Sequence, residues 1–99
     1  MKLLFEEQDL IDAICVYGAK KMHVNPEDII AKLNFHPERG YIGEAEVEDT
    51  GDYYEFDNEK LIRAIEFYLE DAHYFLPHRL EIELKGEHSL GAKIKVLTR

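Results

Sequence analysis

Histidine is the most conspicuous source of chemistry in this sequence, because imidazole nitrogens are common ligands of transition metals. Five histidines are dispersed along the chain: His23, His36, His73, His78 and His88. No pair has the His-x-x-x-His spacing that places two ligands on one face of a helix, and no Cys-x-x-Cys occurs. Any metal site must therefore be assembled by the fold. The candidates are His36 and His88, which lie in two predicted turns, and simple solvation is the alternative for both.

Two further features carry reactive or ligating groups. Cys15 follows an apolar helix position and has no histidine near it in the sequence, which favours a buried, inert thiol over a nucleophile. The acidic run 48–52 offers carboxylates and a glycine, but it lacks the spacing and the closing glutamate of an EF-hand loop. We expect this run to be a solvated connection.

Established catalytic motifs are absent from the sequence. It contains no nucleophile elbow and no glycine-rich phosphate loop. We therefore expect no catalytic residues and no cofactor. Because enzymes also assemble sites from residues distant in sequence, the alternative is a small-molecule or metal-binding enzyme that uses carboxylates in a cleft between the two halves of the chain.

Composition and charge indicate one globular domain spanning residues 1–99. The sequence is 45% hydrophobic and 33% charged, and its formal net charge of -9 disfavours nucleic acid and anionic membranes as partners. Cys15 is the only cysteine, which excludes an intramolecular disulfide and favours the cytoplasm. The N-terminal apolar stretch is shorter than that of a signal peptide. The longest uncharged stretch, 13–19, is too short to span a membrane.

An internal repeat organises the chain. Residues 5–48 align without gaps on residues 56–99, and nine of the 44 pairs are identical, whereas chance gives roughly two or three. The identical pairs are Phe5 and Phe56, Leu10 and Leu61, Ile11 and Ile62, Ala13 and Ala64, Ile14 and Ile65, Tyr17 and Tyr68, Pro26 and Pro77, Leu33 and Leu84, and Gly40 and Gly91. We predict repeat one at 5–48 and repeat two at 56–99.

Each repeat opens with a pattern typical of an amphipathic helix. The shared sequence Leu-Ile-x-Ala-Ile-x-x-Tyr has the i, i+3, i+4, i+7 spacing that lays an apolar stripe along one side. Asp57 is the expected N-cap of the second helix, with Glu59 and Arg63 as an i, i+4 ion pair. Asn25-Pro26 and Leu76-Pro77 predict that each helix has ended by that point.

After each proline the apolar period changes from 3.6 to 2, as in half-buried strands. Strands are expected at 29–35 and 43–48 in the first repeat, joined by a turn at 36–40 in which Gly40 can take positive φ. The second repeat offers strands at 80–85 and 92–97. The predicted order is αββαββ. We expect an α+β fold with a four-stranded antiparallel sheet, both helices on one face, and a pseudo-twofold axis.

The solvent face of that sheet is the expected place for a partner. Glu44, Glu46 and Glu48 lie on one predicted strand, and Lys93 and Lys95 lie on the strand that corresponds to it in the other repeat, so cross-strand pairs form if those strands are neighbours. A merely solvated charged face is the alternative. Apolar and aromatic residues on that face or beside the hairpins are the interface candidates: Ile30, Ile42, Leu97, Tyr41, Tyr53, Tyr54 and Phe75.

The opening 17 residues, MKLLFEEQDLIDAICVY, followed by Asn-Pro-Glu-Asp and a strand, resemble the small YxcD-like proteins of Bacillus-type bacteria. The likeness runs along most of the chain. That family is an uncharacterised one, so the resemblance implies a bacterial cytoplasmic protein of this length and transfers no site residues. The histidine-rich turns look less typical of the family, which makes any metal site particular to this chain.

The function expected from these observations is a non-catalytic protein-interaction module, with a homodimer as the expected assembly. The sequence does not identify a ligand or a partner.

Overall fold

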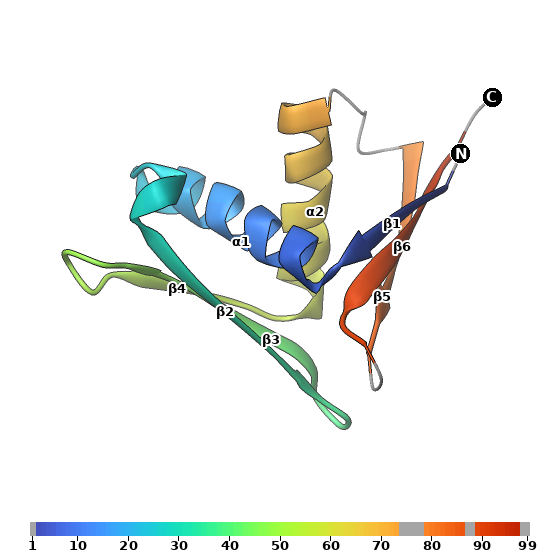
Figure 1. Cartoon of the computed structure of the whole chain (residues 1–99), viewed down its shortest axis with the longest axis horizontal. Helices are drawn as coiled ribbons and strands as arrows, with labels where there is room; N and C mark the ends of the chain where they lie inside the picture. Colours follow the sequence, from blue (N-terminus) through green and yellow to red (C-terminus); the bar gives the residue numbers. More distant parts are fainter. Residues whose placement is uncertain (1, 74–78, 87–88, 98–99) are drawn as a thin grey trace.

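Two helices and six strands make up the part of the chain that the computed structural model describes, residues 2–73, 79–86 and 89–97. In order, the elements are β1 (Lys2–Glu6), α1 (Glu7–Met22), the short 3-10 helix η1 (Pro26–Asp28), β2 (Ile29–His36), β3 (Gly40–Val47), β4 (Tyr53–Phe56), α2 (Asn58–His73), β5 (Leu80–Lys85) and β6 (Gly91–Val96). The predicted α+β class is confirmed (Figure 1).

Helix α1 ends before Asn25-Pro26, as its sequence predicts, and both of its ends are held by hydrogen bonds. The carboxylate of Asp9 accepts a hydrogen bond of 2.8 Å from the Glu6 amide, which satisfies a backbone donor at the start of the helix. At the other end His23 adopts the left-handed conformation (φ 58°), and the Val24 amide donates to the Ala19 carbonyl at 3.0 Å. His23 therefore has a structural role as the residue that ends α1 before Pro26.

Helix α2 has the predicted N-cap. The side chain of Asp57 accepts a hydrogen bond of 2.8 Å from the Lys60 amide. One turn later Arg63 and Glu59 form the expected i, i+4 ion pair at 3.2 Å. Neither helix in the described ranges is both long and apolar enough to cross a membrane.

The strands form two antiparallel sheets of three. The terminal sheet has the order β1-β6-β5 and the central sheet the order β2-β3-β4. Both predicted hairpins are present, β2 with β3 and β5 with β6, and Gly40 has the positive φ, 82°, that the first turn was expected to need. The sheets diverge in Figure 1, and both helices lie in the angle between them.

This architecture corrects the predicted four-stranded sheet with both helices on one face. Strands β1 and β4 lie just before the two helices, where no strand was expected. Each pairs with the returning strand of the other half, β1 with β6 and β4 with β3. The two hairpins therefore gain a third strand each and do not pair with one another.

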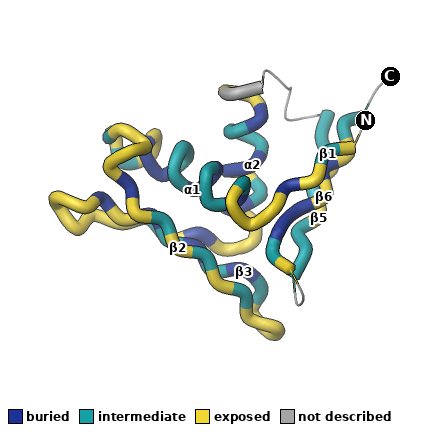
Figure 2. The backbone as a smooth tube through the Cα atoms, viewed as in Figure 1, coloured by how far each residue is buried: buried dark blue, intermediate teal, exposed yellow. Residues whose placement is uncertain are grey.

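The core lies between the sheets and the helices. Side chains from both helices and from the inner faces of both sheets form one buried cluster, and Figure 2 shows the exposed positions gathered at the hairpin turns and the loop before β4. The fully buried positions include Leu10 and Ile14 of α1 and Leu61 and Ile65 of α2, as their stripes predict. Gly18 permits close packing, because a Cβ there would lie 2.6 Å from the Cβ of Ala45 in β3.

Candidate functional site: the outer faces of the two sheets

The outer face of the central sheet brings three of the predicted interface residues together. In the register of the sheet, Ile30 of β2 lies opposite Glu46 of β3, and Glu46 lies opposite Tyr53 of β4. Ile42 is on the same face of β3, four residues before Glu46. Ile30 is 44% exposed and Tyr53 is 64% exposed, which is unusual for large hydrophobic side chains. We call this surface the acidic face, for the charges described next.

Carboxylates surround these apolar side chains. Lys32, Glu44 and Glu55 occupy directly opposed positions on the three strands, and Glu46 separates Ile30 from Tyr53. The face thus carries three carboxylates within its strands and a single ammonium, in a chain of net charge -9. Its potential is negative, and it favours positively charged groups.

The expected pairing of Glu44 and Glu46 with Lys93 and Lys95 is wrong, because β3 and β6 lie in different sheets. Lys93 and Lys95 instead lie opposite Glu83 and Glu81 of β5. Opposite charges therefore face each other between β5 and β6, whereas Lys2 of β1 lies opposite Lys95. Glu48 follows the last residue of β3. Its backbone amide donates a hydrogen bond of 3.1 Å to the Asp28 carbonyl, which connects this end of the strand to η1.

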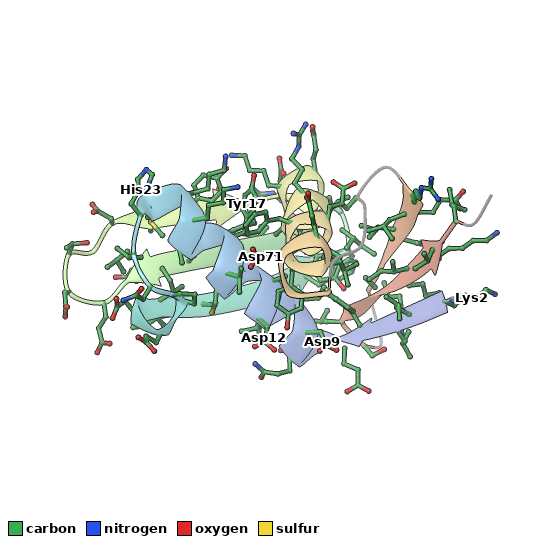
Figure 3. All side chains as sticks on the ribbon, turned by 90° about the horizontal axis from the view of Figure 1, so that it is seen from above. Lys2, Asp9, Asp12, Tyr17, His23 and Asp71 are labelled. Atoms are coloured by element: carbon green, nitrogen blue, oxygen red, sulfur yellow. The ribbon has the colours of Figure 1, made fainter. Side chains whose placement is uncertain are left out.

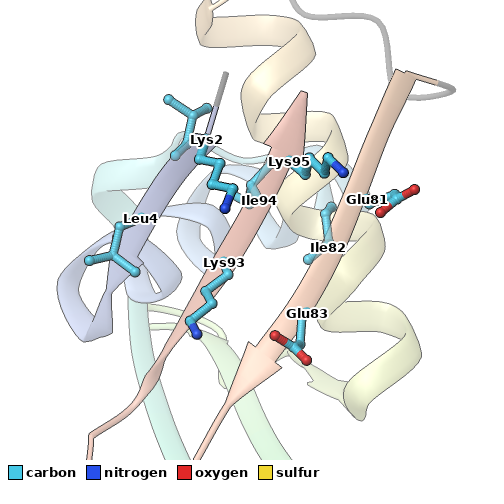
Figure 4. Close-up of a pocket in the computed structure, with 9 residues that line it drawn as sticks. Lys2, Leu4, Glu81, Ile82, Glu83, Lys93, Ile94 and Lys95 are labelled. Carbon is cyan, nitrogen blue, oxygen red and sulfur yellow. The ribbon is translucent and has the colours of Figure 1, made fainter. Parts of the chain in front are cut away.

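A shallow concavity of about 620 Å³ lies on the terminal sheet. Its lining residues come from all three strands: Lys2, Leu3, Leu4, Glu81, Ile82, Glu83, Lys93, Ile94 and Lys95. Figure 4 shows the charged side chains and Leu4 standing on the exposed side of this sheet. Leu4 is 60% exposed. Sequence reasoning missed this surface because it did not predict β1 as a strand.

Tyr41, a predicted interface residue, is instead buried, with 2% of its surface exposed. Its hydroxyl donates a hydrogen bond to the Lys85 carbonyl and accepts one of 2.9 Å from the Gly91 amide. The tyrosine of β3 thus joins the central sheet to the hairpin of the terminal sheet. Its own amide donates to Asn58 Oδ1 at 2.8 Å, which fixes the start of α2 to the same point.

Of the other predicted interface residues, two are half-buried and one lies outside the described residues. Tyr54 is half-buried and packs edge-to-face against Tyr17 and Phe56, with centroid distances of 6.3 and 5.1 Å. Leu97 is half-buried, and its amide donates to the Arg79 carbonyl at 2.6 Å. Phe75 lies outside the described residues.

The metal candidates are not brought together in the described part of the chain. His36 is exposed at the end of β2, and His88 lies outside the described residues. Within residues 2–73, 79–86 and 89–97, no group of three or more His, Cys, Asp or Glu side chains is arranged to hold a metal ion.

Burial changes the acid–base behaviour of three groups. It raises the pKa of the Cys15 thiol above its ordinary value of 9.0, and nearby Asp12 raises it further. Burial also raises the pKa of Tyr41 above 10.0; the hydrogen bond with the Gly91 backbone lowers it in part, and Glu7 adds to the increase. For Tyr68 burial again raises the pKa, with Asp12 and Asp9 as further causes. Cys15 is half-buried and not fully buried as its sequence predicted, and a thiol with a raised pKa is a weaker nucleophile at neutral pH.

These shifts predict that the protein loses stability at alkaline pH. Folding favours the neutral form of each group, so the stabilisation is complete below the ordinary pKa values of 9.0 and 10.0. It is lost as the pH rises through the raised values of the folded state. Urea unfolding between pH 8 and pH 11 should show a declining midpoint above about pH 9. Tyr41→Phe should flatten the decline, and Tyr53→Phe, at an exposed position, is the matched control. A midpoint independent of pH over this range would contradict the expectation.

The comparisons with known proteins agree with the resemblance seen in the first helix. The "Uncharacterized protein YxcD" of Bacillus subtilis (strain 168) is 28% identical over 93 residues, which cover 92% of this chain and 88% of that protein. No solved structure matches the chain significantly. The family model described as "Protein of unknown function (DUF2653)" matches residues 1–89. With a match over most of its length, the chain belongs to the DUF2653 family.

Proposed function

We propose that this chain is a non-catalytic protein-interaction module that acts as a homodimer and binds its partner through the acidic face. The observation that carries the proposal is the exposure of Ile30 and Tyr53 beside Glu46 on one side of the central sheet. Large apolar side chains that are exposed close together on one surface often mark an interaction site. The acidic face thus combines large apolar side chains with charged ones, and protein interfaces contain both.

The charges of the acidic face define the chemistry of the partner. Glu44, Glu46 and Glu55 attract a protein surface in which Lys or Arg side chains surround an apolar patch. The same carboxylates oppose contact between two acidic faces, because like charges directly opposite one another are destabilising. The acidic face therefore suits a different protein better than a second copy of this chain.

We infer that the two halves are structural repeats related by a pseudo-twofold axis within a single domain. In support, β4, α2, β5 and β6 each begin 51 positions after β1, α1, β2 and β3. The reciprocal exchange of β1 and β4 between the halves also favours a twofold relation. The single cysteine supports a reducing compartment, and we propose the cytoplasm.

Affinity capture with a matched pair of variants tests the proposed function. The tagged protein is incubated with a lysate of Bacillus subtilis, the source of the relative described above. Captured proteins are identified, purified and titrated against the wild type and against the double variant Ile30→Glu, Tyr53→Glu. We expect one captured protein to bind the purified wild type, and its dissociation constant to rise at least about tenfold with the double variant, since two exposed apolar anchors are replaced by like charges.

The control is Glu81→Lys, which changes a charge on the terminal sheet and leaves the acidic face intact. It should bind the partner with unchanged affinity. The proposal is overturned if every captured protein binds the wild type and the Ile30→Glu, Tyr53→Glu variant equally, or if none binds the purified wild type.

A further inference from the structure

We propose that a second copy of this chain adds to the terminal sheet along β1, with the two β1 strands antiparallel about a twofold axis at Leu4. The result is a continuous six-stranded sheet. The inference rests on the homodimer of the proposed function and names its surface, which is distinct from the acidic face.

The open edge of β1 is available for pairing. The sheet order places β1 at one edge of the terminal sheet, with β6 as its neighbour on the other side. In Figure 3, β1 runs along the margin of the molecule from Lys2 toward Asp9. An edge strand presents a row of backbone donors and acceptors that can pair with another chain.

The backbone groups of Leu4 point to that open edge. The Gly91 amide of β6 meets the Tyr41 hydroxyl, which also reaches the Lys85 carbonyl, so Gly91 directs its backbone groups toward β5. Glu6, which lies opposite Gly91, must then direct its own groups away from β6; consistently, its amide donates to Asp9. Because this direction alternates along a strand, Leu4 and Lys2 also direct their backbone groups away from β6.

The side chains of β1 complement those of a second β1. Antiparallel pairing about Leu4 sets each Lys2 opposite the Glu6 of the other copy and sets the two Leu4 side chains opposite each other. Opposite charges across neighbouring strands stabilise the pair, and contact between the leucines removes apolar surface from water. The exposure of Leu4, 60%, is explained by this contact.

The other three edge strands lack this complementarity. In β5, an axis at either Ile82 or Glu83 sets carboxylates opposite carboxylates. Strand β2 contains Lys32 but no acidic residue, and β4 contains Glu55 but no basic one. Among the edge strands of the described residues, β1 alone has an acid and a base within the strand, equally spaced on either side of an exposed apolar residue; in β2 the corresponding acid, Asp28, lies in η1 just before the strand.

The oligomeric state of two charge-reversal variants tests the proposal. Sedimentation velocity over a series of concentrations should show a dimer for the wild type. Lys2→Glu and Glu6→Lys should each weaken self-association at least about tenfold, because like charges then face each other twice across the axis. A mixture of the two variants should form a heterodimer, since an acid again faces a base at both positions. Circular dichroism and melting of each variant verify that it folds.

Amide hydrogen exchange provides an independent measurement. Protection of the Leu4 amide in the wild type should rise with protein concentration, because that donor is bonded only in the dimer. Ile30→Glu, on the acidic face, is the control and should leave the dimer intact.

The outcomes separate this proposal from the proposed function. A wild-type dimer that both charge reversals leave unchanged, or a mixture that fails to associate, overturns the β1 contact and leaves the interaction module standing. A dimer lost with Ile30→Glu but kept with Lys2→Glu and with Glu6→Lys moves the contact to the acidic face and overturns the proposal. A wild type that stays monomeric at every concentration overturns both the β1 contact and the homodimer, whereas partner binding is judged by the capture experiment alone.

Discussion

Tyr41→Ala is expected to lower the free energy of unfolding by about 3–5 kcal/mol, the range for removing a large aromatic side chain from a core. Tyr41 is 2% exposed, and its ring packs edge-to-face on Phe35 at a centroid distance of 5.2 Å. The substitution also takes the hydroxyl away from the Gly91 amide and the Lys85 carbonyl. Urea unfolding followed by far-ultraviolet circular dichroism measures the loss.

Tyr41→Phe separates the ring from the hydroxyl. It retains the ring contact with Phe35 and removes only the hydrogen bonds, so the expected loss is about 1–3 kcal/mol, the cost of leaving buried polar groups unpaired. If Phe costs as much as Ala, the ring contributes nothing. If Phe costs nothing, the hydroxyl does not hold the hairpin of the terminal sheet to the central sheet.

Leu10→Ala and Leu61→Ala are each expected to cost about 2–5 kcal/mol, because both side chains are fully buried and their removal leaves cavities. The two leucines are counterparts in the proposed repeat, one on α1 and one on α2, and we expect losses of similar size. Chemical denaturation of both variants at one protein concentration provides the comparison.

Leu4→Ala is the matched control for these helix variants. The same atoms are removed from a side chain that is 60% exposed, so the cost in the monomer should stay below about 1 kcal/mol. A loss at Leu10 or Leu61 no larger than that at Leu4 would contradict the shared core between the helices.

Helices and hairpins could be predicted because their signals are local. The stripe of Leu10, Ala13 and Ile14 describes one side of α1 without reference to any other element. Asp57 caps α2 through an amide three residues away. Alternation in 29–35 and the glycine at 40 likewise specify the first hairpin from adjacent residues.

The pairing between halves could not be predicted, because nothing local encodes it. Leu3 and Leu4 are consecutive apolar residues in β1, and Tyr53 and Tyr54 are consecutive aromatics in β4, so neither strand shows a clear period of two. Both are also short. Their identity as strands depends on β6 and β3, which are distant in sequence, and the sheet arrangement depends on them.

The residues of the candidate surfaces could also be predicted only in part. Ile30, Ile42 and Tyr53 were named from sequence, and the register of the central sheet places them on one face. Tyr41 is, like Tyr53, an aromatic residue next to a predicted hairpin strand, and the sequence does not distinguish the two. In the structure the Tyr41 hydroxyl donates a hydrogen bond to the Lys85 carbonyl. No sequence pattern indicated that Leu4 is exposed, because its exposure depends on its place in the terminal sheet, and that sheet was not predicted.

The pairing of β1 with β6 also determines when the terminal sheet can form during synthesis. Strand β1 is translated long before β6, the strand that covers its inner edge, because all the other helices and strands lie between them in the sequence. Leu3 and Phe5 therefore have no strand to pair with until the residues opposite them in β6 have been translated. Pairing between segments so far apart is also slow to form. The terminal sheet can therefore form only after β6 has been translated, and β1 is the strand of this sheet that stays unpaired longest.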